Sequence, residues 1–220
     1  MIDKNKLETV SLFIDHTLLV PWASKIQITK ICSEAKKYNF KSVCVNPIWV
    51  KLCSGLLKNS NAKLCTVVGF PLGASTTKIK VEEAKDALKN GADEVDAVMN
   101  LGEFKSKNYS FVLKELKALR KILKNKIFKV IIESPVLNSQ EIIKACRIVQ
   151  KSGADFIKTS TGYNVPSTKI SDVRLINKIL DPKIKIKASG GIRTFSKALK
   201  MINAGASRLG TSSSLAIISK

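Results

Sequence analysis

Short apolar runs alternate with amphipathic stretches along the chain. The runs are rich in Val, Ile and Phe and predict eight β-strands, and apolar residues at helical spacing fill the gaps between them. The predicted strands lie near residues 11–15, 40–45, 63–69, 93–99, 127–133, 155–159, 184–188 and 207–210. The clearest predicted helices are 76–90, 106–124, 139–152 and 168–180. Ser139 and Thr194 are expected to cap helices, because each opens an amphipathic run.

A short motif recurs where predicted helices give way to strands. Residues 90–93, 152–155 and 204–207 read Asn-Gly-Ala-Asp, Ser-Gly-Ala-Asp and Ala-Gly-Ala-Ser, so each helix ends at a glycine that can adopt the left-handed conformation. Alternating strands and helices imply parallel pairing with right-handed crossovers. Eight such units, with no Gly-x-Gly-x-x-Gly after the first strand, predict a single α/β domain over residues 1–220, a closed (β/α)8 TIM barrel.

The charge of the chain admits a second class of function. The 220 residues carry a formal net charge of +21, which suits nucleic acid or a membrane surface. The lysines are scattered at helical spacing, however, and aromatic residues are only 6%, which is few for a base-stacking surface. We therefore interpret most of the charge as solvated helix faces that also attract phosphorylated substrates. Nucleic-acid binding is the weaker alternative, and a salt titration of DNA binding would identify it.

The cysteines and the single histidine limit the possible chemistry. Five cysteines occur without C-x-x-C spacing, which is typical of a reducing compartment, and we expect a cytoplasmic protein. Residues 1–6 lack the apolar core of a signal peptide, and no apolar run reaches the roughly 18 residues of a membrane span. His16 is the only histidine, so we expect it to form hydrogen bonds and not to bind metal. With no clustered cysteine ligands either, the sequence predicts no metal and no cofactor.

Two lysines within apolar strands are the main candidates for catalysis. Lys158 and Lys187 each lead into a turn of small residues, at the strand ends where a barrel places its active site. An ammonium group in a partly apolar site beside a second ammonium is pushed toward its neutral, nucleophilic form, which can make a Schiff base. Asp96 stands in a third apolar strand. It serves either as a proton relay for these lysines or as a structural ion-pair partner.

The last two predicted strands end in motifs that suit an anion. Residues 190–193 read Gly-Gly-Ile-Arg, and residues 210–213 read Gly-Thr-Ser-Ser. Glycines let backbone N–H groups approach a phosphate, and loops at this position form the recurring phosphate site of TIM barrels. One pattern has no firm account. Strict alternation places Lys185 on the same inward face as Lys187, unless its side chain leaves through the lower rim.

Together these residues make the chain resemble the deoxyribose-phosphate aldolase family over nearly its whole length. The resemblance is carried by Ile-Asp-His-Thr-Leu-Leu at 14–19, Ser-Val-Cys-Val-Asn-Pro at 42–47 and Val-Gly-Phe-Pro-Leu-Gly at 68–73. It continues with Ala-Asp-Glu-Val-Asp at 92–96, Phe-Ile-Lys-Thr-Ser-Thr-Gly at 156–162, Lys-Ala-Ser-Gly-Gly-Ile-Arg at 187–193 and Gly-Thr-Ser-Ser at 210–213. The resemblance implies a (β/α)8 barrel and reversible, metal-independent cleavage of 2-deoxyribose 5-phosphate into acetaldehyde and glyceraldehyde 3-phosphate.

The resemblance also implies roles for individual residues. Lys158 would form the Schiff base, Lys187 would favour its reactive form and take part in proton transfer, and Asp96 would act with Lys187 in the proton relay. Asp15 and Thr161 would border the substrate hydroxyls. The phosphate would be held by Gly162, Gly190, Gly191, Arg193, Gly210, Ser212 and Ser213. We further expect a homo-oligomer, either a dimer or a tetramer.

Two departures from the family pattern affect phosphate binding and proton transfer. Tyr163 stands where some relatives carry a lysine that contacts phosphate, and the chain ends without the terminal tyrosine that some relatives bring to the active site. An alternative enzyme reading is a phosphosugar isomerase or lyase that uses Lys158 only as a charge. Borohydride trapping separates the two, because only an imine is trapped.

Overall fold

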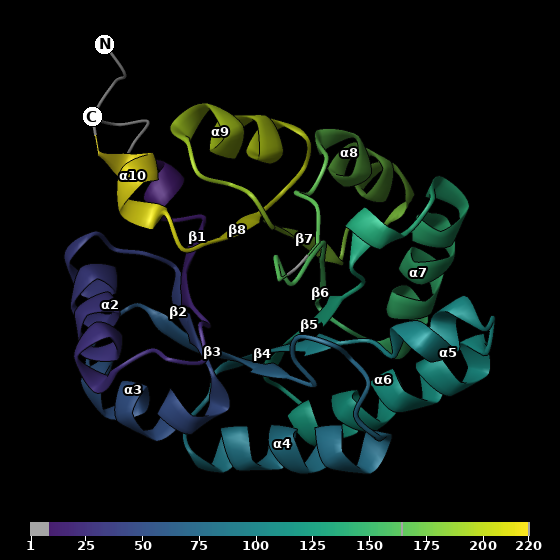
Figure 1. Ribbon diagram of the computed structural model, residues 1–220, viewed down its shortest axis with the longest axis horizontal. Coiled ribbons are helices and arrows are strands. Elements are labelled where there is room, and N and C mark those ends of the chain that lie inside the picture. The colour runs from purple at the N-terminus through teal and green to yellow at the C-terminus, as the bar shows by residue number, and fades with distance from the viewer. Residues whose placement is uncertain (1–8, 164, 220) are drawn as a thin grey trace.

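The computed structural model describes residues 9–163 and 165–219, which form a closed barrel of eight parallel strands in the order β1 to β8 (Figure 1). The predicted TIM barrel is therefore confirmed. Residues 1–6, on which the expectation about a signal peptide rests, lie outside the described part. The strands are β1 Ile14–Leu18, β2 Ser42–Val45, β3 Lys63–Val68, β4 Glu94–Val98, β5 Ile127–Ile131, β6 Phe156–Lys158, β7 Lys185–Ser189 and β8 Arg208–Thr211.

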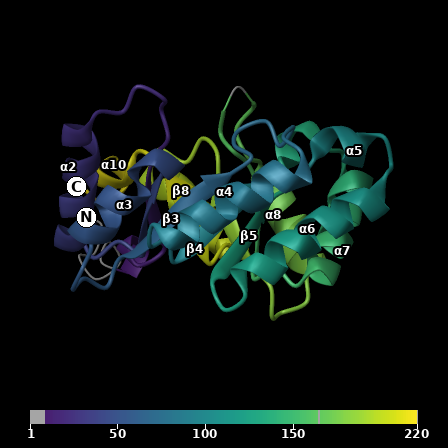
Figure 2. The ribbon, with the colours of Figure 1, turned by 90° about the horizontal axis from the view of Figure 1, so that it is seen from below.

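Helices surround the barrel, as the two perpendicular views show (Figures 1 and 2). Their apolar faces pack on the outer face of the strands, which explains the helical spacing of apolar residues in the sequence. The helices are α2 Lys25–Lys37, α3 Val50–Leu56, α4 Thr77–Lys89, α5 Leu101–Lys105, α6 Tyr109–Leu123, α7 Ser139–Ser152, α8 Ile170–Ile179, α9 Phe195–Asn203 and α10 Ser214–Ile218. Among the residues that the structure describes, no helix has the length and apolar character that crossing a membrane requires.

The three repeated motifs are helix-to-strand joints, as predicted. Gly91, Gly153 and Gly205 have φ angles of 103°, 79° and 113°, in the region that favours glycine. Two residues after each glycine, the backbone N–H groups of Asp93, Asp155 and Ser207 donate to carbonyls of the preceding strand. Each glycine therefore turns the chain directly from the end of a helix into the barrel.

Two local predictions were wrong by a few residues. The first strand is Ile14–Leu18 and not 11–15, because the Phe13 N–H donates to the Val10 carbonyl at 3.0 Å and closes a turn there. Helix α7 is capped by Asn138 and not by Ser139. The Asn138 side chain accepts the N–H of Glu141, and the Glu141 carboxylate accepts the N–H of Asn138. Thr194 caps α9, as predicted.

The interior of the barrel is divided into an apolar side and a charged side. On β2 and β3, Cys44, Cys65 and Val67 form a small apolar cluster. All five cysteines are free and buried, in agreement with their expected use as small core residues. The charged side is buried as well and consists of Asp15, Glu94, Asp96, Lys129, Lys158, Lys187 and Arg208. The chemistry of the barrel lies on this side.

Candidate active site

A cavity of about 210 Å³ opens at the carboxyl ends of the strands. Nine of the predicted site residues line it, namely Lys158, Thr161, Gly162, Gly190, Gly191, Arg193, Gly210, Ser212 and Ser213. Sequence reasoning did not assign the other lining residues to the site; these are Thr17, Leu18, Leu19, Val20, Phe70, Tyr163, Ser189, Ile192 and Thr211. The barrel has thus gathered the ends of five different strands, and the loops that follow them, around one opening.

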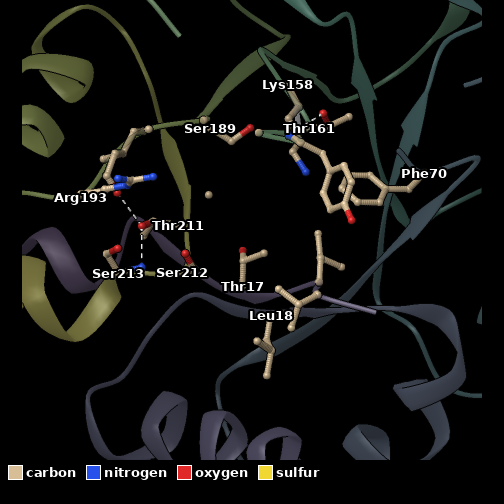
Figure 3. Close-up of a pocket in the computed structure, with 18 residues that line it drawn as sticks. Thr17, Leu18, Phe70, Lys158, Thr161, Ser189, Arg193, Thr211, Ser212 and Ser213 are labelled. Carbon is tan, nitrogen blue, oxygen red and sulfur yellow. Dashed lines mark hydrogen bonds between the residues drawn. The ribbon is translucent and has the colours of Figure 1, made fainter. Parts of the chain in front are cut away.

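The two ends of the cavity differ in chemistry. Figure 3 shows Arg193, Ser212 and Ser213 on one side, and Lys158 with Phe70 on the other. The loop after β8 is fixed by its own hydrogen bonds, since the Thr211 hydroxyl donates to the Ile192 carbonyl at 2.7 Å and accepts the Ser213 N–H at 2.9 Å. A cationic, hydroxyl-rich end therefore faces an amine across the cavity.

Lys158 is the last residue of β6, and its side chain reaches the floor of the cavity. Only 3% of the residue is exposed. Its ammonium donates to Asp96 Oδ2 at 2.9 Å and lies 6.0 Å from the centre of the Phe70 ring. Phe70 in turn meets Tyr163 edge to face, with ring centroids 6.3 Å apart. The amine therefore has one carboxylate beneath it and an aromatic wall beside it.

Lys187 is held more tightly than Lys158 and has no contact with the cavity. The two lysines are direct register partners on β6 and β7, so their side chains share the inner face. The Lys187 ammonium lies 2.7 Å from Asp96 Oδ2, the oxygen that Lys158 also contacts, and 2.6 Å from Asp15 Oδ2. Burial lowers the pKa of Lys187, but the two carboxylates outweigh burial and raise it well above its ordinary value. Lys187 is therefore a fixed positive charge close to Lys158.

Asp96 is the carboxylate that joins these lysines. It is fully buried, which raises its pKa, but Lys129, Lys158 and Lys187 outweigh burial and hold the pKa well below its ordinary value. Both readings of Asp96 from the sequence thus apply to its position: it forms ion pairs, and it touches the amine at the cavity floor. Its role as a proton relay remains a prediction.

Asp15 lies beneath the cavity and not at its edge. It is fully buried and forms ion pairs with Lys187 and Arg208. Burial raises the pKa of Asp15, but these two cations outweigh it and hold the pKa below the ordinary value. Thr17, two residues further along the same face of β1, reaches the cavity in its place. That Asp15 borders the substrate hydroxyls remains a prediction.

Four buried charged residues near the site were not predicted to have a role in it. Lys129, Glu94 and Arg208 lie on β5, β4 and β8 and pair with the groups already described. Glu133, which follows β5, accepts the Ser160 hydroxyl at 2.5 Å and the Thr161 N–H at 3.0 Å, so it holds the loop after Lys158. The sequence pattern that could have indicated them is a charged residue inside or at the end of an apolar strand.

Two glycines are required by close packing in the site. A Cβ atom on Gly210 would lie 3.0 Å from Lys187 Cε and 2.9 Å from Ser189 Cβ, so this glycine leaves room for the stem of Lys187. Gly191 has a φ angle of 76°, and a Cβ there would meet Ser167 Oγ at 2.1 Å. Gly210 thus serves the lysine pair as well as the wall of the cavity.

Comparison with known proteins shows which family the chain belongs to. The sequence profile of the DeoC/LacD family aldolases matches residues 9–220. The chain belongs to this aldolase family. It is 53% identical over 214 residues to the deoxyribose-phosphate aldolase of Caldicellulosiruptor saccharolyticus, covering 96% of this chain and 97% of that one. It is 50% identical over 220 residues to the deoxyribose-phosphate aldolase of Clostridium kluyveri, covering 100% of both chains.

Solved structures agree with the family. A deoxyribose phosphate aldolase from Aeropyrum pernix, described as having a unique tetrameric structure, matches with a TM-score of 0.90 and 32% identity. The match covers 96% of this chain and 90% of that chain. The lysine pair, Asp96 and the cavity thus occur in a barrel that is shared with aldolases.

One expectation about metal ligands was wrong. The sequence shows no closely spaced cysteines, but the aldolase barrel brings Cys44, Cys65 and Asp96 together, with one potential ligand atom from each within 4.8 Å of the others. These cysteines are register partners on neighbouring strands, a pairing that sequence spacing cannot reveal. Asp96 already binds three lysine ammonium groups, which makes the cluster unfavourable for a further cation.

Two other expectations about single residues are settled by their contacts. His16 forms hydrogen bonds, as predicted, with the Ser214 hydroxyl at 2.7 Å and Glu34 Oε2 at 2.8 Å. Burial lowers the pKa of His16, although the contact with Glu34 opposes this effect. Lys185 is exposed and lines an opening beside Arg208 at the lower end of the aldolase barrel, so its side chain does leave through the lower rim.

Proposed function

We propose that this aldolase cleaves 2-deoxyribose 5-phosphate reversibly into acetaldehyde and glyceraldehyde 3-phosphate, through a Schiff base on Lys158. The observation that carries the proposal is the pair of register partners Lys158 and Lys187, of which only Lys158 lines the cavity. Lys187 has two carboxylates, whereas Lys158 has a single carboxylate that it shares with Lys187. Lys158 is therefore the amine of the pair that can give up its proton and attack a carbonyl.

The chemical steps follow from this arrangement. The neutral Lys158 amine attacks C1 of the open-chain sugar, and loss of water leaves an iminium ion. The iminium accepts the electron pair of the C2–C3 bond when a base removes the proton of the C3 hydroxyl group, and carbons 3 to 5 leave as glyceraldehyde 3-phosphate. The resulting enamine is protonated at C2, and hydrolysis then releases acetaldehyde and free Lys158. Asp96 and Lys187, both beneath the reacting nitrogen, relay the protons of these steps.

The opposite end of the cavity would hold the phosphate. Arg193 supplies a positive charge there, Ser212 and Ser213 supply hydroxyl groups, and the glycine pair 190–191 lets backbone N–H groups come close. Because Tyr163 occupies the position of a lysine in some relatives, Arg193 carries more of the phosphate binding. Phosphate at this end places the aldehyde carbon toward Lys158.

The remaining expectations are part of the same proposal. The iminium ion serves as the electron sink, so the proposed steps need neither a metal nor an organic cofactor. The aldolase would work in the cytoplasm, where its five buried thiols stay reduced. It would assemble as a homo-oligomer, which the tetrameric relative from Aeropyrum pernix supports. Light scattering on the eluting peak of a sizing column would measure the assembly.

Borohydride trapping tests the proposal. The protein is incubated with acetaldehyde or 2-deoxyribose 5-phosphate, reduced, digested and mapped by mass spectrometry. We expect one stable adduct on Lys158 that requires both aldehyde and borohydride. No adduct, or an adduct on another lysine, would contradict the proposal, and turnover without an adduct would favour a lyase or isomerase that uses Lys158 only as a charge.

A further inference from the structure

Six buried charges inside the barrel form a closed ring of ion pairs. Asp15, Asp96 and Glu94 supply the negative charges, and Lys187, Lys129 and Arg208 supply the positive ones. Each carboxylate contacts two cations of the ring, and each cation contacts two carboxylates. The charges therefore alternate and cancel within the ring.

The contacts of the upper half of the ring include the proposed proton relay. Lys187 bridges Asp15 and Asp96 at 2.6 and 2.7 Å. Asp96 Oδ1 then accepts a hydrogen bond from the Lys129 ammonium at 2.9 Å. All of these side chains are buried, so their interactions are only weakly screened by solvent.

The lower half of the ring, like the upper half, does not line the cavity. The Lys129 ammonium donates to Glu94 Oε2 at 2.5 Å, and Glu94 Oε1 accepts from Arg208 at 2.6 Å. Arg208 also donates to Asp15, which closes the ring. Burial lowers the pKa of both Lys129 and Arg208, but their carboxylate partners outweigh it and raise both values.

Lys158 is attached to this ring without being part of it. Among the residues that the structure describes, its one ion pair is with Asp96 Oδ2, and this carboxylate already has two ring cations. Because the six ring charges cancel, the Lys158 ammonium would be a seventh, uncompensated charge in the interior. A buried uncompensated charge is unfavourable, whereas the neutral amine leaves the interior balanced.

We propose that Glu94, Lys129 and Arg208 are positioning residues that keep Lys158 in its reactive neutral form by completing a neutral ring beneath it. The inference deepens the proposed function and rests on it, because the neutral form of Lys158 matters only if Lys158 is the nucleophile. It predicts that removing a ring anion and removing a ring cation shift the protonation of Lys158 in opposite directions. Removing a ring anion leaves a net positive ring that repels the ammonium, and removing a ring cation leaves a net negative ring that favours it.

Other ionisable groups around Lys158 stay the same in such variants. On the neighbouring strands and loops these are Asp15, Cys44, Cys65, Asp96, Lys187, Glu133, Tyr163 and Arg193. Burial raises the pKa of Cys65 well above its ordinary value, so this thiol stays neutral. A hydrogen bond with Cys65 lowers the pKa of Cys44, so the titration of this thiol could overlap with that of Lys158. The same ring variants are therefore also made without it. A Cys44→Ala background removes the thiol without touching the ring.

The test measures the reactivity of the Lys158 amine directly. The protein is labelled with trace acetic anhydride at a series of pH values, and acetylation of Lys158 is quantified by peptide mapping. We expect Glu94→Gln to move the midpoint of this profile down by roughly one pH unit, and Lys129→Met and Arg208→Gln to move it up by a similar amount. Lys129 and Arg208 lie on different strands, so the two variants need not fold equally well. The upward shift is measured on the variant that folds better.

Matched controls separate charge from structure. Arg208→Lys and Glu94→Asp keep the charge of the ring and should leave the midpoint in place. Glu115→Gln disrupts a buried ion pair outside the barrel, with Lys80, and should also leave it in place. Shifts of the same sign in the anion and cation variants, or no shift in folded variants, would overturn the inference. Acetylation does not depend on turnover, so failed borohydride trapping with shifted acetylation would refute only the proposed function.

Discussion

Buried lysines outside and inside the barrel differ in how many carboxylates they contact. Lys80 on α4 is fully buried between helices and donates to Glu115 at 2.8 Å and to the Val98 carbonyl at 2.9 Å. Burial lowers the pKa of Lys80 even though Glu115 opposes it. Lys129 and Lys187 are buried as deeply but contact two carboxylates each, and their pKa values are raised.

Burial thus outweighs the one carboxylate at Lys80, whereas the two carboxylates at Lys129 and at Lys187 outweigh burial. Lys158 has one carboxylate, as Lys80 does, but it faces a cavity and Lys80 does not. A single shared carboxylate and access to a ligand occur together at Lys158. This combination is the basis for proposing Lys158, and not Lys80, as the nucleophile.

Replacing Lys158 should give the largest effect. Lys158→Ala and Lys158→Arg remove the nucleophile, and an arginine cannot replace it because it stays charged. We expect borohydride adducts to disappear and turnover to fall by at least about a hundredfold, since a covalent step is lost. Circular dichroism should show a folded barrel. The matched variant Lys80→Met should keep the adduct, and activity above a hundredth in either Lys158 variant would contradict the assignment.

Removing the single carboxylate of Lys80 should mainly affect stability. Glu115→Gln leaves a buried ammonium without a counter-charge, and we expect the free energy of unfolding to fall by about 3 kcal/mol at pH 7. The pKa of Lys80 is lowered in the folded state, so the unfolded chain binds this proton more tightly. Stability linked to Lys80 therefore increases as the pH rises toward the unfolded value, and the deficit of Glu115→Gln should shrink by pH 10.

Urea denaturation at several pH values measures this effect. Glu82→Gln is the control, because its pair with Lys85 is half-exposed on both sides and is worth little. A deficit in Glu115→Gln that is constant from pH 7 to pH 10 would show that loss of packing, and not the buried charge of Lys80, causes it.

Replacing Lys187 should have an intermediate effect on the pH profile. Lys187→Leu removes a fixed positive charge next to Lys158, so the ammonium form of Lys158 is less disfavoured. The pH midpoint of imine formation, measured by borohydride trapping, should rise by about one unit, which corresponds to roughly 1.4 kcal/mol. Lys185→Leu, two residues earlier on β7 but at the exposed lower rim, should leave the midpoint unchanged. Equal midpoints in Lys187→Leu and the unmodified protein would show that the two lysines are not coupled.

Chelation should give the smallest effect. Dialysis against EDTA should leave turnover unchanged, because an iminium ion serves as the electron sink in the proposed steps. Added zinc should not raise activity, since three ammonium groups surround the only carboxylate of the cluster formed by Cys44, Cys65 and Asp96. Loss of activity in EDTA that zinc restores would favour a metal-dependent reaction.

The sequence predicted elements and strand-end residues better than it predicted contacts inside the barrel. Repeated glycine joints and two periodicities located eight strands, and only the first was displaced, by a turn within an apolar run. Lys158, Lys187 and Asp96 were predicted as catalytic because charged residues within apolar strands are unusual, and the structure places their charged groups in contact. Lys129 and Arg208 carry the same signal and are register partners of Asp96 and Lys187, but this pairing cannot be read from the sequence.

The sequence could not predict which side chains inside the barrel contact one another. Asp15 was expected at the edge of the cavity. Whether an inward-facing strand residue reaches the cavity or is buried beneath it depends on its register with the neighbouring strands, which the sequence does not reveal. The aromatic wall of Phe70 and Tyr163 joins loops that are far apart along the chain. Neither residue has a local pattern that indicates its partner.

The charges of the ring are sorted along the chain. Its three acids come from β1 and β4, in the first half of the sequence, and its bases, with Lys158, come from β5 to β8, in the second. Each half-barrel alone would confine charges of one sign on its inner face. Their docking is therefore the association of oppositely charged surfaces, and refolding in stopped-flow experiments should slow as salt screens this attraction. The carboxylates around Lys158, the proposed nucleophile, are neutralised only when the second half of the chain docks on the first.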